Sequence, residues 1–323
     1  MAQEMVIMVG LPGSGKTTAV LKLTTSEPGK WYRVNYDELR RLDPNWKWTP
    51  QNEKRMQQDA VDLAKEAARH GLNIIVDNTN VSTRAREKWV RLAEELGITW
   101  RFEVLRPTLS SCMDNDAKRP ANERVGRAVI ERMALFGGND PFGKPWLEFN
   151  HQQLVLVDMD GTLADCSHRR VHIHQPCPGC DGNKFTSYDG NGRTVCTVCS
   201  GSGNRKNDWD SFFATCIDDP AIKTVCSLVR KVCFFYTICI VSGRPLDKAG
   251  EQTIEWLKRN EITFDHIFMR NSGDHRPDDL VKEEILKHLP KERIAFVLDD
   301  RQRVVDMWRR NGLTCLQVAE GNF

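Results

Sequence analysis

The chain has 323 residues, of which 40% are hydrophobic and 28% charged, and its 46 basic and 44 acidic side chains leave a net charge of +2. This length allows two independent cores, and the near-neutral balance excludes a protein uniformly coated with basic charge. The longest apolar run, near VCFFYTICIV, is too short to cross a bilayer. The chain begins on a strand without a basic signal segment, so we expect a cytoplasmic protein with no membrane contact.

The first half predicts apolar strands that alternate with amphipathic helices. A long helix is expected over 49–71, with Thr49 as its N-cap, Pro50 at its first position and Gly71 after its end. A further helix over 82–97 is closed by Gly97. Strands are expected at 5–10, 72–80 and 99–105. The alternation is typical of an α/β unit with a parallel sheet covered on both faces.

A glycine-rich loop follows the first strand and leads into a helix. It fits the pattern G-x4-G-K-[ST], in which backbone N–H groups and a helix N-terminus surround a phosphate. Lysine reaches the β/γ oxygens and the following threonine can bind Mg²⁺. We therefore expect a nucleoside triphosphate, ATP or another, to be held by Gly10, Gly13, Ser14, Gly15, Lys16, Thr17 and Thr18.

Three polar groups follow that could serve a phosphoryl acceptor. Asp37 stands at the end of the second strand, where it is a general base or, more commonly for an aspartate there, a helix N-cap. Asp77 ends a strand and is a candidate carboxylate near Mg²⁺, with Asn78 beside it. Lys118 and Arg119 form either a mobile lid over the γ-phosphate or a solvated basic face. The sequence leaves these alternatives open.

A stretch rich in Gly and Pro, 137–152, predicts a linker, after which a second strand and helix series begins. We expect two tandem domains, a P-loop phosphotransferase at 1–148 and a second domain at 149–323. The second series starts with LVLVDMD and continues through YTICIVSG, FDHIFMR, IAFVLDD and TCLQV. Both domains are thus predicted to be parallel-sheet α/β folds.

The motif DMDGTL, at 158–163, resembles the signature of the haloacid-dehalogenase-type phosphatases, and VSGR, DDLVKEEI and FVLDD follow in that family's order. The resemblance implies that Asp158 attacks phosphorus and that Asp160 protonates the leaving oxygen. Ser242 and Lys282 would hold the phosphoryl oxygens. The Mg²⁺ ligands it implies are the acidic residues of these motifs, with the Met159 carbonyl: Asp158, Asp160, Asp299 and Asp300. Hard oxygen ligands at strand ends suit Mg²⁺.

The order of the two sites resembles the phage-type bifunctional polynucleotide 5′-kinase/3′-phosphatases over most of the chain. The matching segments are GLPGSGKTT, NYDELR, DNTN, the Lys118–Arg119 pair, the phosphatase motifs and the C-terminal DDRQRVVDMWRRNGLTCLQVAEGNF. This resemblance implies healing of broken DNA or RNA ends for a ligase, and a homo-oligomer. It makes Asp37 the base on the 5′-hydroxyl. The other residues that it implicates are Arg40, which grips the acceptor, Arg119, which stabilises the transferred phosphoryl, and Arg244, Asp278 and Arg301, which shape the phosphatase site. Asn115 replaces a basic residue that the family commonly has one turn before Arg119.

Eleven cysteines, an odd number, argue against a disulfide framework. Four of them form C-x2-C-x15-C-x2-C inside an insertion at about 175–205, and the second pair resembles DnaJ-type zinc hairpins. This spacing predicts one structural Zn²⁺ held by Cys177, Cys180, Cys196 and Cys199. The basic flanks of the insertion, HRRVHIH and NRKNDW, leave two alternatives: a cap that contacts nucleic acid, or a purely structural module.

Two other functions remain open at this point. One is a small-molecule kinase, for a nucleoside or a sugar, fused to a metabolite phosphatase. The other is a zinc-dependent nucleic-acid-binding adaptor with vestigial sites, against which the intact Lys16, Asp158, Asp160 and Lys282 argue.

Overall fold

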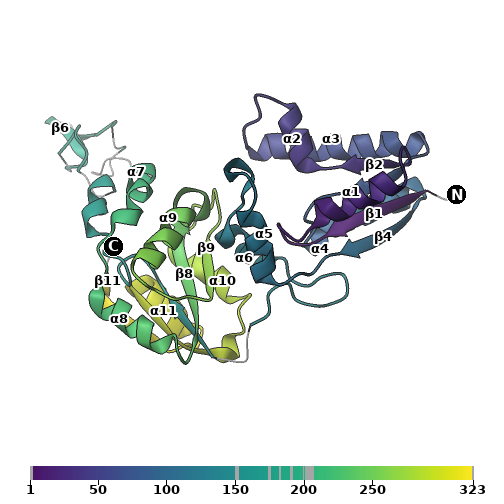
Figure 1. The fold of residues 1–323 in the computed structure, drawn as a ribbon. Helices are drawn as coiled ribbons and strands as arrows, with labels where there is room; N and C mark the ends of the chain where they lie inside the picture. Colours follow the sequence, from purple (N-terminus) through teal and green to yellow (C-terminus); the bar gives the residue numbers. More distant parts are fainter. Residues whose placement is uncertain are drawn as a thin grey trace. The chain divides into compact units, whose positions relative to one another are not determined.

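The computed structural model describes residues 3–149, 153–173, 176–181, 183–189, 192–198, 200 and 207–321. The chain divides into two compact units, Met1–Glu148 and Phe149–Phe323. Each has its own parallel sheet (Figure 1), which confirms the predicted α/β class. Among the helices of the described ranges, none has both the length and the apolar character that crossing a membrane requires.

The sheet of the first unit has the order β2-β3-β1-β4, and all of its neighbouring strands run parallel. Its strands are β1 (Glu4–Val9), β2 (Trp31–Val34), β3 (Asn73–Val76) and β4 (Thr99–Val104). Its helices are α1 (Lys16–Ser26), α2 (Tyr36–Leu42), α3 (Pro50–Arg69), α4 (Thr83–Leu96), α5 (Leu109–Ala117) and α6 (Arg127–Phe136), with a 3₁₀ turn at Ala121–Glu123.

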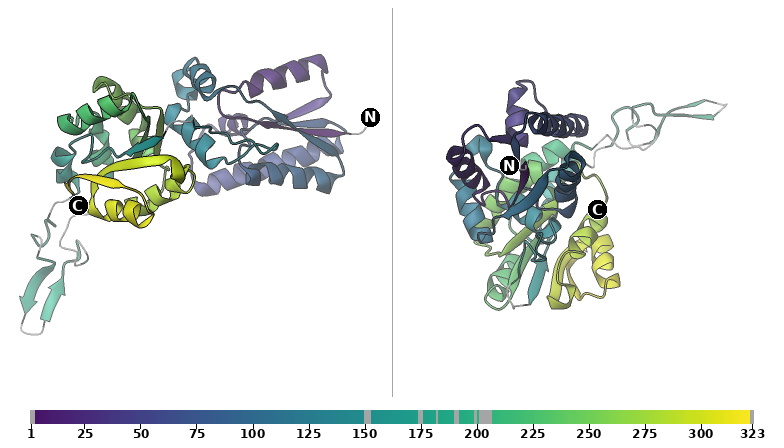
Figure 2. Two further views of the ribbon diagram at one scale, coloured as in Figure 1. Left: turned by 90° about the horizontal axis from the view of Figure 1, so that it is seen from below. Right: turned by 90° about the vertical axis from the view of Figure 1, so that its right-hand side faces the viewer.

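Helices cover both faces of this sheet (Figure 2), so that β1 is buried. On one face Val20 of α1 packs with Val6, Met8 and Ile75. The long helix has the predicted ends: the Thr49 side chain accepts from the Asn52 N–H, and Pro50 is the first residue. Gly97 closes α4 in the left-handed conformation that favours glycine.

The stretch predicted as a linker belongs largely to the first unit. Trp146 is buried, and its indole N–H donates to the Val81 carbonyl at 3.0 Å. Asp140 is also buried, and its carboxylate accepts from Arg106 at 2.6 Å. Gly and Pro therefore mark an ordered, irregular segment here, because its side chains supply contacts that no periodic pattern reveals.

The sheet of the second unit has the order β11-β10-β5-β8-β9 and is also parallel throughout. Its strands are β5 (Leu154–Val157), β8 (Thr237–Pro245), β9 (His266–Arg270), β10 (Ile294–Arg301) and β11 (Cys315–Gly321). Its helices are α7 (Trp209–Ala214), α8 (Lys223–Val232), α9 (Leu246–Arg259), α10 (Asp278–Leu286) and α11 (Gln302–Arg310). Short 3₁₀ segments lie at Ser167–His172, Cys216–Asp218 and Lys291–Arg293.

In the second unit, α8 and α9 cover one face of the sheet and α10 and α11 the other (Figure 2). The insertion contributes an antiparallel hairpin, β6 (Phe185–Asp189) and β7 (Gly192–Val195). Three of the four phosphatase motifs lie at or just beyond the carboxyl ends of β5, β8 and β10, which are adjacent in the sheet, and DDLVKEEI lies on α10. Ligands of open parallel α/β sheets bind at this edge.

Candidate active sites

The glycine-rich loop joins β1 to α1, as predicted. Gly13 and Gly15 have positive φ angles of 76° and 91°. A Cβ on Gly13 would lie 2.1 Å from the Cys112 carbonyl oxygen, so a side chain there would displace backbone. Ser14 is buried, whereas Gly15, Thr17 and Thr18 are exposed at the start of α1. The loop thus presents backbone at a helix N-terminus, the arrangement that binds phosphate.

Lys16 is buried beneath this loop. Its ammonium donates to the carbonyl oxygens of Gly10 and Leu11 at 2.9 and 2.8 Å and to Ser14 Oγ at 3.2 Å. Burial lowers the pKa of Lys16 to about 8; Asp77 opposes this, Arg119 adds to it, and Asp37 opposes it more weakly. The charges of Asp37, Asp77 and Arg119 therefore all act on the Lys16 ammonium, as expected of one site.

Asp77 lies at the end of β3 and is buried beside Thr17. Thr17 Oγ1 donates to its carboxylate at 3.5 Å, and Arg33 Nε donates to the same oxygen at 2.9 Å. The Asn35 side-chain amide donates to the Asp77 carbonyl at 2.7 Å. Arg33 is a functional candidate that sequence reasoning missed, because a single arginine in a strand carries no motif.

Asp37 lies on α2, but it is not the helix N-cap. Asn35 caps the helix, since its side chain accepts from the Glu38 N–H at 2.9 Å. The N-cap alternative for Asp37 is therefore wrong. Its side chain is 71% exposed and pairs with Arg40 at 2.6 Å, and Arg40 also contacts Glu53 at 2.7 Å.

Asn78 and the lid candidates make different contacts. Asn78 accepts from the Tyr36 N–H at 2.9 Å and so fixes the start of α2. Asn115 donates to the Gly13 carbonyl at 2.9 Å and thereby ties α5 to the phosphate loop. Arg119 follows α5, and its guanidinium lies 3.5 Å from the buried Asp116. An asparagine in place of a basic residue thus has a structural role in this chain.

In the second unit, Asp158 follows β5 and is buried against Lys282 of α10. The Lys282 ammonium lies 2.7 Å from Asp158, 3.0 Å from Asp299 and 3.3 Å from Asp278. Burial raises the pKa of Asp158 well above its usual value; Lys282 opposes this, whereas Asp299 and Asp300 add to it. Burial, followed by Asp299, also raises the pKa of Asp300 to about 6.

This cluster suits a divalent cation. Carboxylate oxygens of Asp158, Asp299 and Asp300 lie within 4.8 Å of one another, and all three residues are buried. Burial is the main cause of the raised pKa values of Asp158 and Asp300, and the neighbouring carboxylates, which outnumber the single lysine, add to it. Oxygen ligands are those that Mg²⁺ prefers. Gly161 leaves room for the Asp300 carboxylate, because a Cβ on residue 161 would lie 2.1 Å from that carboxylate.

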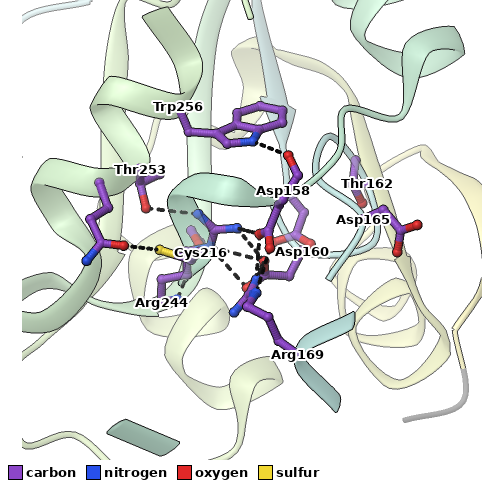
Figure 3. A network of polar contacts seen from close by, with 12 residues as sticks. Asp158, Asp160, Thr162, Asp165, Arg169, Cys216, Arg244, Thr253 and Trp256 are labelled. Atoms are coloured by element: carbon purple, nitrogen blue, oxygen red, sulfur yellow. Dashed lines mark hydrogen bonds and ion pairs between the residues drawn. The ribbon is translucent and has the colours of Figure 1, made fainter. Parts of the chain in front are cut away.

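Asp160 takes a different position: two arginines grip its carboxylate (Figure 3). Arg169 lies 2.7 Å from it and Arg244 2.5 Å. Both arginines also contact the buried Asp219 at 2.7 Å. Burial would raise the pKa of Asp160, but Arg244 and then Arg169 outweigh it and lower the pKa to about 2. The Asp160 side chain thus pairs with cations of the protein rather than with the metal cluster.

Sequence reasoning missed Arg169 and Asp219. Arg169 belongs to the HRRVH segment, which the sequence suggests is a basic surface flank, yet its side chain is fully buried. The aspartate pair Asp218–Asp219 precedes Pro220 without a recognisable motif. Only the fold brings both residues to Asp160, since they are separated from it by 9 and 59 positions.

The remaining predicted residues surround the cluster. Ser242 is buried in β8, and its Oγ accepts from the Arg244 N–H at 3.2 Å. Asp278 begins α10 and accepts from Arg270 at 3.4 Å. Arg301 ends β10, and its backbone N–H donates to Asp299 at 3.3 Å. The structure therefore brings together Asp158, Asp160, Ser242, Arg244, Asp278, Lys282, Asp299, Asp300 and Arg301 at one edge of the sheet.

Replacing Arg244 by methionine should destabilise the second unit by about 3–5 kcal/mol, because Asp160 and Asp219 would be left with one buried cation instead of two. Thermal unfolding of the full chain measures this effect. Arg259→Met is the matched control, since Arg259 pairs with Glu255 while 56% exposed. Equal unfolding temperatures for the two variants would contradict the expected stabilising role of Arg244.

Three of the four predicted zinc ligands cluster in the insertion. Sulfur atoms of Cys177, Cys180 and Cys196 lie within 4.8 Å of one another, and those of Cys177 and Cys196 are 3.7 Å apart. All three residues are buried. Cys199 lies outside the described residues. None of the ten cysteines within the described ranges forms a disulfide.

Both units match known domain families. Residues 5–135 match the model described as "AAA domain", and residues 196–323 match "Polynucleotide kinase PNKP phosphatase domain". The second match begins after most of the insertion, so Asp158 and Asp160 lie outside it. Their place in the site rests on the geometry given above.

Two curated proteins and one solved structure are similar to the chain. A protein of Autographa californica nuclear polyhedrosis virus, named for polynucleotide kinase and RNA ligase, is 22% identical over 95% of this chain. A bifunctional polynucleotide phosphatase/kinase of Schizosaccharomyces pombe is 28% identical over 36% of it. The chain spans 41% and 24% of their lengths. A chain of the Pnkp1/Rnl/Hen1 complex is 22% identical, with full coverage of this chain, 98% of that one and a TM-score of 0.38.

Proposed function

We propose that this chain, which joins an AAA domain to a polynucleotide kinase PNKP phosphatase domain, heals nucleic-acid ends. Residues 1–148 phosphorylate 5′-hydroxyl ends with ATP, and residues 149–323 remove 3′-phosphates. The observation that supports this proposal is the presence of two separate arrangements suited to phosphate, one in each unit, together with the match of the second unit to the polynucleotide kinase PNKP phosphatase domain. A ligase can then join the 5′-phosphate and the 3′-hydroxyl.

In the kinase unit the glycine-rich loop binds the nucleotide phosphates, and Lys16 contacts the β/γ oxygens. Thr17 Oγ1 and the Asp77 carboxylate are the oxygens available to Mg²⁺, and their 3.5 Å separation fits this role. Bound Mg²⁺ would neutralise the phosphate oxygens. Asp37 accepts the proton of the 5′-hydroxyl, Arg40 orients the acceptor, and Arg119 stabilises charge on the transferred phosphoryl.

Nucleotide affinity should fall as pH rises through about 8, because the Lys16 ammonium then loses its proton in the nucleotide-free protein. Binding favours the charged form, so each further pH unit should raise the Kd for ATP by up to about tenfold. Calorimetry in two buffers of different ionisation enthalpy should show proton uptake. A Kd that stays constant between about pH 7 and pH 9 would contradict this linkage.

In the phosphatase unit an Asp158 oxygen attacks the phosphorus and the bond to the 3′-oxygen breaks. Asp160 protonates that oxygen and then accepts a proton from the water that releases phosphate from Asp158. Ser242 and Lys282 hold the phosphoryl oxygens. Asp158, Asp299 and Asp300 would hold Mg²⁺, which neutralises charge between carboxylate and phosphate.

The contacts of Arg169 and Arg244 with Asp160 affect the ability of Asp160 to donate a proton. With a pKa of about 2, the carboxylate is ionised in the substrate-free protein. The negative charge of an incoming phosphate dianion beside Asp160 opposes the effect of Arg244 and Arg169, and so raises the pKa of Asp160 toward the range that proton donation needs. Arg301, which lies at the surface beside Asp160, contacts the substrate, whereas the fully buried Arg244 acts through Asp160.

The nucleic-acid substrate distinguishes this proposal from a metabolic kinase fused to a phosphatase. The test compares phosphorylation of an oligonucleotide 5′-end with that of free nucleosides and sugars at equal concentration. A higher kcat/KM for the oligonucleotide supports end healing, whereas preference for the small molecules overturns it. Binding without turnover would instead favour the adaptor.

We also propose that Cys177, Cys180, Cys196 and Cys199 bind one structural Zn²⁺. The sulfur atoms of Cys177, Cys180 and Cys196 lie close enough together to bind one tetrahedral Zn²⁺. Cys199 forms a C-x2-C pair with Cys196 in the sequence and is the fourth ligand. Thiolate ligands fit a reducing compartment, so we place the protein in the cytoplasm.

Replacing Cys177 and Cys196 by serine should release about one zinc per chain, since two of four ligands are lost. Metal analysis of the purified chain measures this, with Cys233→Ser as the control because Cys233 lies outside the insertion. Absence of zinc from the unaltered protein would contradict the proposed zinc site.

A further inference from the structure

A cleft of about 710 Å³ opens beside Asp158 and Asp160 in the second unit. Its size falls within the range of roughly 300–1,000 Å³ of small-molecule sites. Most of its polar lining comes from the loops around the sheet edge, whereas α7 contributes Trp209, Phe212 and Phe213. The proposed phosphatase chemistry does not use these aromatic rings.

The Trp209 ring packs against the rings of Phe212 and Phe213 and is partly exposed. It is 47% exposed, whereas Phe212 and Phe213 are 6% and 9% exposed. The Trp209 ring stacks on Phe213 with centroids 6.0 Å apart and an interplanar angle of 20°. It meets Phe212 edge-on at 5.5 Å. Phe212 and Phe213 therefore hold the Trp209 indole in place, and part of its surface lines the cleft.

The same aromatic cluster is tied to the catalytic carboxylate. The Arg169 guanidinium lies 4.3 Å from the Phe212 ring centroid and donates to the Phe212 carbonyl at 2.9 Å. Arg169 also holds Asp160 at 2.7 Å. These contacts fix α7, and with it Trp209, relative to the group that protonates the leaving 3′-oxygen.

Cations line the same cleft between the aromatic wall and solvent. Lys248 and Arg276, with side chains 45% and 50% exposed, pair with Asp210 and Asp274 of the same lining. Arg270 and Arg301 lie deeper, beside Asp278. Because these cations are paired with aspartates, the feature of the cleft that favours a nucleotide is the aromatic face, which suits a base of any sequence. A simple sugar phosphate would not use the ring.

We propose that Trp209 is the stacking platform for the base of the 3′-terminal nucleotide, and so determines the specificity of the phosphatase for nucleic-acid ends. This inference rests on the proposed function of the second unit. Trp209 makes no contact with the transferred phosphoryl, so its contribution is to substrate recognition through the base.

The experiment uses the full chain and two oligonucleotides with 3′-phosphates, one normal and one whose 3′-terminal nucleotide lacks its base. Phosphate release gives kcat/KM for the unaltered protein, Trp209→Ala, Trp209→Phe and Phe235→Ala. Phe235 is a matched control, because it is 74% exposed in the same unit and does not line the cleft. Turnover of the baseless substrate reports whether each variant is folded.

The unaltered protein should prefer the normal end by about 5- to 150-fold, the range for stacking of one base. Trp209→Ala should lose that preference and keep its turnover of the baseless end, Trp209→Phe should retain part of it, and Phe235→Ala all of it. An equal preference in Trp209→Ala, or none in the unaltered protein, overturns the platform while leaving end healing intact. Failure of the unaltered protein to release phosphate from either oligonucleotide overturns the proposed function and the platform together.

Discussion

Replacing Asp158 by alanine is expected to abolish 3′-phosphatase turnover, by about 10⁴-fold or more, and to leave 5′-kinase turnover unchanged. The loss is expected because Asp158 alone among the described carboxylates directly follows β5 and lies 2.7 Å from the Lys282 ammonium. Asp299 and Asp278 already occupy the remaining Lys282 contacts. No covalent phosphoryl acceptor would remain at the position that Asp158 occupies.

Asp158→Asn keeps the shape of the side chain and separates chemistry from packing. It should be as inactive as the alanine variant while unfolding at nearly the same temperature as the unaltered protein. Release of 3′-phosphate from an oligonucleotide, measured beside 5′-phosphorylation in the same sample, checks both activities. Loss of kinase turnover in a folded Asp158 variant would show that the two units do not act as separate catalysts.

The reciprocal result is expected in the first unit. Lys16→Ala removes the buried ammonium from the phosphate loop and should reduce kinase turnover by at least about 10²-fold, with loss of nucleotide affinity. Asp37→Ala should reduce kcat by about 10²- to 10⁴-fold with ATP affinity retained, because Asp37 serves the acceptor hydroxyl. Both variants should keep full phosphatase turnover.

Asp37 offers a particularly clean comparison because its side chain is 71% exposed. Its loss removes no buried contact, so a fall in turnover reports chemistry rather than unfolding. Asp62→Ala serves as a control, since Asp62 lies on α3 and its exposed contact is with Gln58. An Asp37→Ala variant with ordinary kinase turnover would remove this residue from the role of base.

Local patterns predicted much of the architecture. Glycines and a lysine between an apolar strand and a helix predicted the loop that joins β1 to α1, where the positive φ angles of Gly13 and Gly15 favour glycine. The ends of α3 and α4 followed from Thr49, Pro50 and Gly97, whose capping roles depend on neighbours in sequence. The strands of the second sheet followed from apolar runs, and those of β5 and β10 lead into acidic residues.

The parts that sequence could not predict depend on distant packing. HRRVH suggests a solvated basic flank, yet Arg169 is buried because Asp160 and Asp219 neutralise it. The Gly/Pro segment suggests a linker, yet Trp146 anchors it under Val81. Trp209 ends the NRKNDW flank, but the sequence could not single it out, because the cleft that it lines is assembled from five separate segments.

The most direct test of end healing uses one oligonucleotide that bears a 5′-hydroxyl and a 3′-phosphate. It is incubated with the protein, Mg²⁺ and ATP, and its two ends are resolved by mass spectrometry after cleavage at a central site. Gain of phosphate at the 5′-end together with its loss at the 3′-end is the predicted result. Two unchanged ends, with ATP consumed on nucleosides or sugars instead, would contradict the account.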